Sequence, residues 1–244
     1  MIWLDAHCHL ANLASVLPLE AAFQEAQDKG IKGFLSNALT KEELKWYAAN
    51  AARYGIEYSA GVHPNFPPCD LEYKDILHLC QQQRLWAVGE IGLDRMNKDF
   101  SAMRQSFIQQ LDLAAEHKLP VVLHIVGHQQ AAYEILREYP LRYLMHGYAG
   151  ATEAFRLFLK LDAYFTISER LLKKDKTLLL SEMLESKRYL FETDITRYYL
   201  KPGEINPLLH LIDLAETVSH RYDIDISELK AIQYDNYLLL RGIK

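Results

Sequence analysis

Short apolar segments alternate with longer helical segments along most of this chain of 244 residues. Eight segments have the length and composition of buried strands: residues 2–5, 31–36, 56–62, 85–91, 120–125, 142–146, 163–167 and 189–193. Helical patterns separate them, at residues 19–29, 41–54, 71–83, 100–117, 129–138, 153–161 and 176–184. Strands that alternate with helices pair in parallel through crossover connections, and eight such units are the number that closes a barrel. The alternation therefore predicts an α/β fold, a single (β/α)8 TIM barrel over residues 1–244, with an open doubly wound sheet as the competing architecture.

Two helical segments remain after the eighth strand, at residues 206–219 and 227–240. We expect them to be extra C-terminal helices that pack outside the barrel. Several predicted helices carry end signals: Thr40 and Asp70 stand where N-cap residues belong, and Gly30 and Gly55 stand just past helix ends.

The composition is that of an ordinary globular protein, with 50% hydrophobic and 24% charged residues. No stretch approaches the roughly 18 apolar residues of a membrane helix, and the first residues lack the basic start and apolar run of a secretory signal. Three cysteines, Cys8, Cys69 and Cys80, are an odd number without CxxC spacing. These features predict a cytoplasmic protein without a membrane partner.

The charge balance leaves the substrate open. The 27 basic and 32 acidic residues give a net charge of −5, which is not typical of a nucleic-acid-binding protein. It does not exclude one, because bound divalent cations add positive charge where a polyanion binds.

Metal-ligating residue types recur at the ends of the predicted strands, which is where barrel enzymes carry their reactive side chains. They are His7, His9, Glu90, His124, His146 and Asp194. Residues two apart on a strand share a face, so His7 and His9 can both point into the mouth of the barrel. Six nitrogen and oxygen ligands exceed the needs of one tetrahedral site and suffice for two ions, with Glu90 placed to bridge them.

Each of these residues alone also has an ordinary structural explanation. A single HxH pair often serves as a hydrogen-bonded strand end, and a lone histidine or glutamate at a strand end is usually structural. The coincidence of all six at separate strand ends of one predicted barrel favours the metal site.

The motifs around these residues resemble the TatD family of metal-dependent deoxyribonucleases, a branch of the amidohydrolase-like barrels. The resemblance runs in order from Ile2 to Asp194 and rests on Asp5-Ala6-His7-Cys8-His9-Leu10, Gly61-Val62-His63-Pro64, Gly89-Glu90-Ile91-Gly92-Leu93-Asp94, His146-Gly147-Tyr148-Ala149-Gly150 and Glu192-Thr193-Asp194. A weaker similarity appears at Asn206-Pro207 and at Asn236.

The resemblance implies a role for each matching residue. One metal ion would be held by His7, His9, Glu90 and Asp194, and a second by Glu90, His124 and His146. Asp194 would also orient or deprotonate the attacking water, so Asp194 and Glu90 are the expected catalytic residues. His63 would lie near the substrate phosphate, although a histidine satisfied by backbone in the turn before Pro64 is the alternative. The mixed ligands fit Mg²⁺, Mn²⁺ or Zn²⁺.

The chain departs from the family pattern in three loops. Asp194 is followed by Ile195-Thr196-Arg197 instead of a small residue, proline and tyrosine. Arg95 follows Leu93-Asp94 in place of the usual tyrosine, and Ile125 follows His124 where an arginine is often near. These changes leave the predicted metal ligands intact and concern the substrate.

Basic and aromatic residues follow several predicted strands and are candidates for substrate contacts. Arg95 and Arg197, with Arg170 after the seventh strand, could contact phosphates, and aromatic side chains could stack unpaired bases: Phe66, Tyr148, Tyr198 and Tyr199.

The resemblance implies a metal-dependent nuclease that trims DNA from a 3′ end, preferably single-stranded. A second hypothesis is hydrolysis of a small amide, ester or phosphoester, and a third is a catalytically idle barrel that binds nucleic acid or protein. Some relatives act beside partner proteins encoded with them. The sequence does not predict an oligomeric state, and a monomer is compatible with it.

Overall fold

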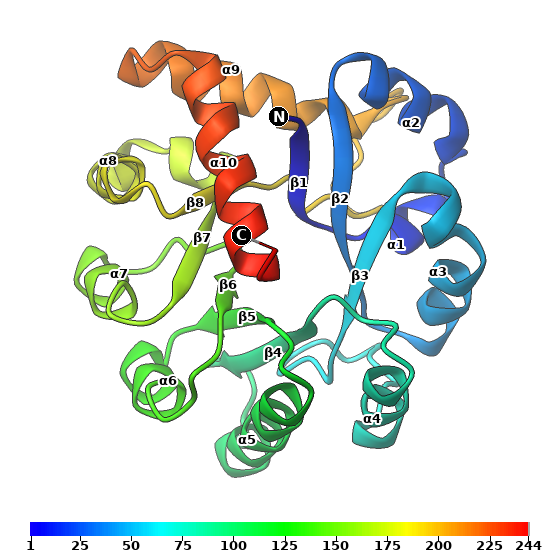
Figure 1. The fold of residues 1–244 in the computed structure, drawn as a ribbon, viewed down its shortest axis with the longest axis vertical. Coiled ribbons are helices and arrows are strands. Elements are labelled where there is room, and N and C mark those ends of the chain that lie inside the picture. Colours follow the sequence, from blue (N-terminus) through cyan, green and yellow to red (C-terminus); the bar gives the residue numbers. More distant parts are fainter. Residues whose placement is uncertain (244) are drawn as a thin grey trace.

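The strands form one parallel sheet in sequence order. The computed structural model describes residues 1–243. Its strands are β1 (Trp3–Cys8), β2 (Ile31–Ala38), β3 (Ile56–Ala60), β4 (Val88–Asp94), β5 (Val121–Val126), β6 (Tyr143–Met145), β7 (Ala163–Ile167) and β8 (Tyr189–Phe191). Figure 1 shows them as a ring with helices around the outside.

Hydrogen bonds between the segment after β8 and β1 bring the two ends of the sheet together. The Asp194 N–H donates to the His7 carbonyl at 3.0 Å, and the His9 N–H donates to the Ile195 carbonyl at 3.0 Å. The buried carboxylate of Asp5 accepts from the Thr193 N–H at 3.0 Å. The nearly closed ring of eight parallel strands confirms the predicted TIM barrel.

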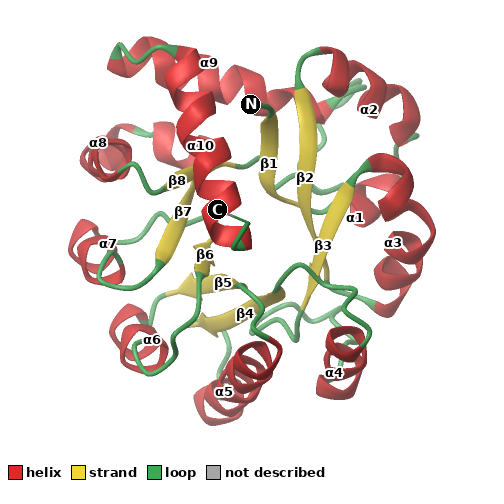
Figure 2. Ribbon diagram, viewed as in Figure 1, coloured by secondary structure: helices red, strands yellow, loops and turns green. Residues whose placement is uncertain are grey.

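Helices follow most of the strands (Figure 2). They are α1 (Leu10–Ala14), α2 (Leu19–Asp28), α3 (Lys41–Tyr54), α4 (Tyr73–Gln81), α5 (Phe100–His117), α6 (Gln129–Leu136), α7 (Thr152–Phe158), α8 (Thr177–Ser186), α9 (His210–Tyr222) and α10 (Ile226–Arg241). Short 3-10 turns lie at Glu169–Leu172, Lys174–Lys176 and Pro207–Leu209. No helix among the described residues has the length and hydrophobicity needed to cross a membrane.

The helix-end signals are only partly borne out. Helix α3 begins after Thr40, whose hydroxyl accepts from the Glu43 N–H, and it ends at Gly55 in the left-handed conformation. Asp70 is not the N-cap that we predicted. Helix α4 begins at Tyr73 with Glu72 as its cap, and Asp70 instead accepts from the Lys41 N–H at 2.8 Å, which ties the loop before α4 to the start of α3.

Strand β4 lies three residues later than predicted, so Glu90 stands inside the strand and not at its end. The backbone around it is irregular, because the pairing with β5 shifts register between Val88 and Ile91. Gly92 has φ +148°, and a Cβ there would lie 2.1 Å from the His124 carbonyl oxygen. Only glycine allows β4 and β5 to approach this closely.

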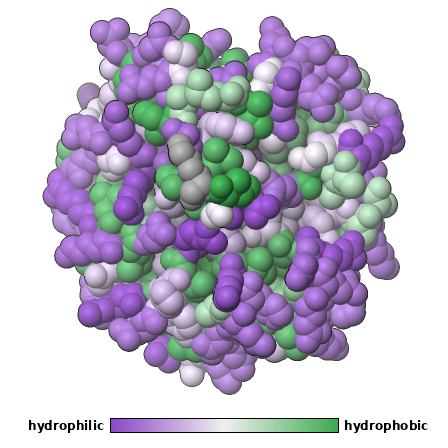
Figure 3. All heavy atoms as spheres, in the orientation of Figure 1, coloured by the Kyte–Doolittle hydropathy of each residue, from purple (hydrophilic) through white to green (hydrophobic). Residues whose placement is uncertain are grey.

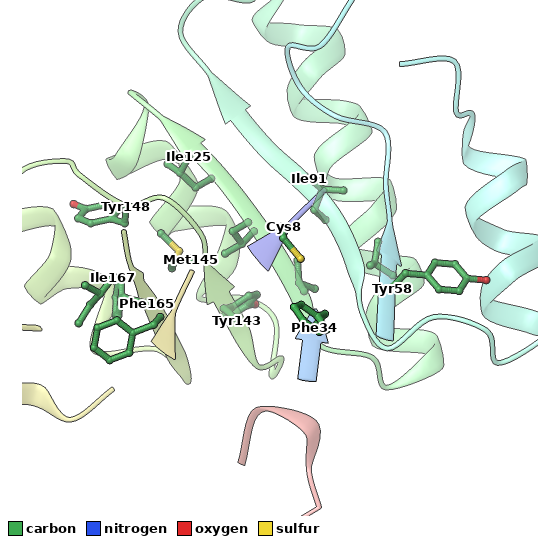
Figure 4. Packing of buried hydrophobic residues seen from close by; sticks show 14 of the residues in the cluster. Cys8, Phe34, Tyr58, Ile91, Ile125, Tyr143, Met145, Tyr148, Phe165 and Ile167 are labelled. Carbon is green, nitrogen blue, oxygen red and sulfur yellow. The ribbon is translucent and has the colours of Figure 1, made fainter. Parts of the chain in front are cut away.

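Two apolar clusters lie on opposite faces of the sheet, as strand alternation requires. The larger packs strand residues such as Phe34, Tyr143 and Phe165 against the surrounding helices (Figure 4). The smaller fills the inside of the barrel with the intervening residues of the same strands, among them Leu35 and Leu144. The interior is therefore a packed core.

Helix α10 crosses the middle of the ring of strands (Figure 1). Leu240 belongs to the interior cluster, Asn236 donates to the carbonyls of Lys187 and Tyr189 at the start of β8, and Arg142 before β6 donates to the Leu239 carbonyl. The helix thus closes the N-terminal end of the barrel. The sequence predicted only that this helix would pack outside the barrel. The face in Figure 3 is largely hydrophilic, with hydrophobic residues near its centre.

Candidate metal centre

The six predicted metal ligands come together at the C-terminal end of the barrel. They are carried by β1 (His7), the residue after it (His9), β4 (Glu90), β5 (His124) and the segments just after β6 and β8 (His146 and Asp194). Most of them line a pocket of about 270 Å³ that is open to solvent, which we call the metal pocket. Of the HxH pair, His9 lines this pocket and His7 lies buried behind it, with the two Nε2 atoms close together although the register of β1 is irregular between Asp5 and Cys8.

Four of these side chains form a first group of ligand atoms. The Nε2 atoms of His7 and His9 are 3.3 Å apart. His7 Nε2 lies 3.6 Å from Glu90 Oε1 and 3.8 Å from Asp194 Oδ1, and His9 Nε2 lies 3.5 Å from each of the same oxygens. Two nitrogens and two carboxylate oxygens thus face one point.

A second group gathers on the other oxygen of Glu90. His124 Nδ1 lies 3.6 Å from Glu90 Oε2, and His146 Nε2 lies 2.7 Å from it. The two ring nitrogens are 3.3 Å apart. Glu90 therefore has one oxygen in each group, which is the arrangement of a carboxylate that bridges two ions.

The spacing of these atoms fits divalent cations. Ligand atoms that bind one ion tetrahedrally at about 2.1 Å lie roughly 3.4 Å from one another. The five distances given for the first group, and two of the three in the second, lie between 3.3 and 3.8 Å. Hydrogen bonds between the same atoms would be shorter, near 2.9 Å.

Asp94 holds His124 in the orientation that such a site needs. His124 Nε2 lies 2.9 Å from Asp94 Oδ2, so that nitrogen donates to Asp94 and Nδ1 is directed at the second group, where an ion would take the place of its proton. Burial disfavours protonation of His124, but the bond to Asp94 and the charge of Glu90 outweigh it and raise the pKa of His124 to about 9. Asp94 belongs to the Gly-Leu-Asp stretch after Glu90, and the sequence alone did not assign it this role.

Two buried atoms beside His146 lack hydrogen-bond partners. His146 Nδ1 and Glu192 Oε2 face each other at 3.9 Å, too far for a direct bond, and neither has another partner. Metal-bound histidines usually direct the second ring nitrogen toward a carboxylate. The unpartnered pair therefore fits a centre in which His146 Nε2 is a ligand.

The charges of the site favour cation binding. Burial would raise the pKa of Glu90, but His146 and His7 outweigh it and hold that pKa well below its usual range. The pKa of Asp194 is likewise lowered, because the neighbouring imidazoles of His9, His146 and His7 outweigh burial. Burial and the neighbouring His146 hold the pKa of His7 well below its ordinary value, so its imidazole is neutral. Ionised carboxylates and neutral imidazole are the forms that bind metal. Burial disfavours protonation of His9, but the carboxylates of Asp194 and Glu90 outweigh it and raise the pKa of His9 to about 9, so an ion would displace a proton from His9.

His63 lies beside the second group but has the wrong tautomer for a ligand. Its Nδ1 accepts from the Asn65 N–H at 2.9 Å, so Nε2 carries the proton, and this N–H lies 3.6 Å from Glu90 Oε2. The turn before Pro64 therefore satisfies one ring nitrogen and leaves the other as a donor facing the pocket. A donor at this position suits an anionic substrate group.

Two side chains that sequence reasoning did not place at the centre contact its carboxylates. Asn37, at the end of β2, donates to Glu90 Oε1 at 2.8 Å, and Ser59 on β3 fixes the orientation of this amide. Arg170, after β7, donates to Asp194 Oδ2 at 2.8 Å. Asp194 itself has φ +52°, an uncommon conformation for a residue other than glycine, and it is held there by its backbone bond to β1.

The predicted substrate residues are distributed unevenly around the pocket. Arg197 lines a second depression that adjoins the metal pocket. Arg95 lies against Gly127 and lines neither of these two depressions. Phe66, Tyr198 and Tyr199 line the metal pocket. Tyr148 is buried and donates to the Ala151 carbonyl, so it cannot stack on a base.

A comparison with known protein families identifies the relationship that these residues indicate. The model of the family described as TatD related DNase matches residues 4–241. The chain belongs to this family. It is accordingly a metal-dependent hydrolase acting on ester bonds, as the sequence predicted.

Individual relatives of the TatD family align over nearly the whole chain. The 3'-5' ssDNA/RNA exonuclease TatD of Escherichia coli is 26% identical over 238 residues, covering 89% of this chain and 90% of that protein. The metal-dependent hydrolase MJ1582 of Methanocaldococcus jannaschii is 24% identical over 244 residues, covering 96% and 94%. The crystal structure of YjjV, a TatD homolog of Escherichia coli, superposes with a TM-score of 0.80 at 24% identity, covering 98% and 97%. This last similarity establishes the shared fold.

Proposed function

We propose that this TatD-family chain is a deoxyribonuclease that removes nucleotides from the 3′ end of single-stranded DNA at a centre of two divalent ions, Mg²⁺, Mn²⁺ or Zn²⁺. The observation that carries the proposal is the position of Glu90, whose two oxygens face two separate groups of ligand atoms. The exonuclease named among the relatives supports the choice of a nucleic-acid substrate.

In this proposal the ligands divide as the family resemblance implies. His7, His9, Glu90 and Asp194 would hold one ion, and Glu90, His124 and His146 the other. Bound ions would make water a stronger nucleophile and stabilise the departing 3′ oxygen of the scissile bond.

Asp194 is the proposed general base. Its Oδ1 faces the first group of ligands, and its Oδ2 is restrained by Arg170. The lowered pKa keeps its carboxylate ionised and able to accept a hydrogen bond from the attacking water. A general base needs this fixed position as much as its charge.

Cations and donors around the pocket would bind the scissile phosphate. The His63 N–H faces the second group of ligands, and the half-exposed guanidinium of Arg170 lines the same pocket beside Asp194. Both can donate hydrogen bonds to phosphate oxygens.

Four further expectations stay predictions: a cytoplasmic location, one domain over residues 1–244, a monomeric state and a partner protein encoded alongside.

The test is cleavage of an end-labelled single-stranded DNA oligonucleotide with Mg²⁺, Mn²⁺, Zn²⁺ or EDTA. We expect metal-dependent shortening from the 3′ end, none with EDTA, and a loss of about 10²- to 10⁴-fold in kcat for Asp194→Asn. Asp175→Asn is the matched control, because Asp175 is an exposed aspartate of the turn after β7. Wild-type activity in Asp194→Asn would overturn its role, and a folded, metal-loaded protein that cuts no DNA would overturn the nuclease.

A further inference from the structure

A second depression adjoins the metal pocket. It has a volume of about 330 Å³ and lies between α1, the first turns of α3 and the loops after β3 and β8. We call it the aromatic groove, defined by Trp46, Phe66, Arg197 and Tyr198. It adjoins the metal pocket, because Phe66 and Tyr198 line both. A ligand at the metal pocket therefore lies next to the groove.

The aromatic side chains of the groove pack against neighbouring rings and remain partly exposed to solvent. Trp46 packs edge-on against the buried ring of Tyr47, with ring centroids 5.3 Å apart. Phe66 packs edge-on near His63 at 6.1 Å. Trp46 and Phe66 are half-buried, and Tyr198 is 63% exposed. The groove thus presents partly fixed aromatic faces to solvent next to the metal pocket.

Arg197 adds a flat cation to the same wall. Its backbone N–H donates to Asn12 Oδ1 at 3.0 Å, which ties the loop after β8 to α1. Its guanidinium lies over the ring of Tyr198, 4.9 Å from the centroid, and donates to the Tyr198 hydroxyl at 2.8 Å. This pairing places a planar charged group beside the aromatic faces. Arg197 and Tyr198 both belong to the segment after Asp194 that departs from the family pattern.

We propose that the aromatic groove binds one unpaired nucleobase of the strand whose phosphodiester lies at the metal pocket. The proposal rests on the proposed nuclease function and adds a binding site to it. Aromatic rings and guanidinium planes stack on bases of any sequence, because every base has a flat face. A base that is paired and stacked within a duplex cannot enter a groove of this size, so the groove selects for a single-stranded end.

The test combines a protein variant with a modified substrate. The variant is Trp46→Ala, because Trp46 lines the groove and is not among the residues around the metal pocket. The substrates are one single-stranded oligonucleotide and the same oligonucleotide with an abasic nucleotide at each of the last 3′ positions in turn. We expect Trp46→Ala to raise KM for the intact strand at least about fivefold, the lower end for loss of one stacked base.

The abasic substrates separate stacking from a general defect. With the wild-type protein, removing the base at one particular position should raise KM by a similar factor. With Trp46→Ala, the same removal should have no further effect, because the base has already lost its stacking partner. Trp46→Phe should restore most of the affinity. Tyr73→Ala is the matched control, since Tyr73 is a 41% exposed aromatic residue at the start of α4 outside the groove, and it should leave KM unchanged.

Tyr198→Ala provides a second variant, because the exposed ring of Tyr198 contributes little to packing. An unchanged KM in both variants, or an equal abasic effect in wild type and Trp46→Ala, would overturn the nucleobase site while leaving the nuclease intact. Hydrolysis of methyl 4-nitrophenyl phosphate, a diester without a base, tests the chemistry separately. If the wild-type protein cleaves neither this diester nor DNA, the nuclease function fails and the nucleobase site fails with it.

Discussion

Replacing Asp94 with alanine should weaken the second of the two proposed metal sites while leaving the first in place. Asp94 contacts no proposed metal ligand except His124, whose Nε2 lies 2.9 Å from the Asp94 carboxylate. Without this acceptor the imidazole can rotate or change tautomer, and Nδ1 no longer points at the second group of ligands. His7 and His9 have no contact with Asp94 and should bind their ion as before.

The size of the effect follows from the hydrogen bond that is lost. A hydrogen bond to a charged group contributes about 1.5–3 kcal/mol to the folded arrangement. The bond is shielded from water, since the side chains of Asp94 and His124 are 7% and 18% exposed. At 1.4 kcal/mol for each tenfold change, the affinity of the second site should fall about 10- to 150-fold. Losses of about 10- to 100-fold are typical when the carboxylate behind a metal-bound histidine is removed.

Calorimetric titration of the metal-free protein with Mn²⁺ or Zn²⁺ measures both sites. We expect two binding steps in wild type and, in Asp94→Ala, a weakened second step with the first unchanged. Asp94→Asn keeps an amide oxygen as a neutral acceptor, and neutral bonds are about half as strong, so its loss should be smaller. Urea unfolding checks that the variant is folded, because Asp94 also accepts from the Met96 N–H at 2.8 Å. Two unchanged binding steps in a folded Asp94→Ala would refute the reasoning.

Two further variants test the fold around the site. Gly92→Ala should lower the free energy of unfolding by about 2–4 kcal/mol, because its Cβ would lie 2.1 Å from the His124 carbonyl oxygen at φ +148°; a urea midpoint equal to that of wild type would contradict this. Thr40→Ala should cost about 1 kcal/mol by removing the cap of α3, and Thr40→Ser should restore most of it; equal midpoints for all three proteins would show that the cap contributes nothing.

The convergence of the ligands could be predicted without coordinates because it depends on a regular property of the fold. The C-terminal ends of all barrel strands meet at one face, so His7, His124 and Asp194 approach one another although 187 positions separate the first from the last. The strand alternation that identifies the barrel also identifies this face. The alternation does not predict where a residue lies within a strand whose pairing is irregular. Glu90 lies inside β4, in the stretch between Val88 and Ile91 where the pairing with β5 shifts register.

The side chains that orient the ligands were not recognisable from the sequence. Asn37 and Asp94 are ordinary polar residues at strand ends, and Arg170 was one of several basic residues after β7. Their contacts with Glu90, His124 and Asp194 depend on the packing of strands far apart in the chain. The position of α10 also depends on tertiary packing. Its apolar residues predict a helix, but they do not predict that this helix closes the N-terminal end of the barrel.

The order of strands and helices, the barrel and the residue types at its mouth follow from local hydrophobic periodicity and short motifs, so they could be inferred from the residues alone. Folding fixes which oxygen of Glu90 faces which histidines, how the rings of His63 and His124 are oriented, and how the segment after Asp194 meets α1 and α3. These features depend on distances of a few tenths of an ångström between atoms brought together by folding. Hydrogen bonds and metal coordination are sensitive to distances on that scale, and residue patterns are not.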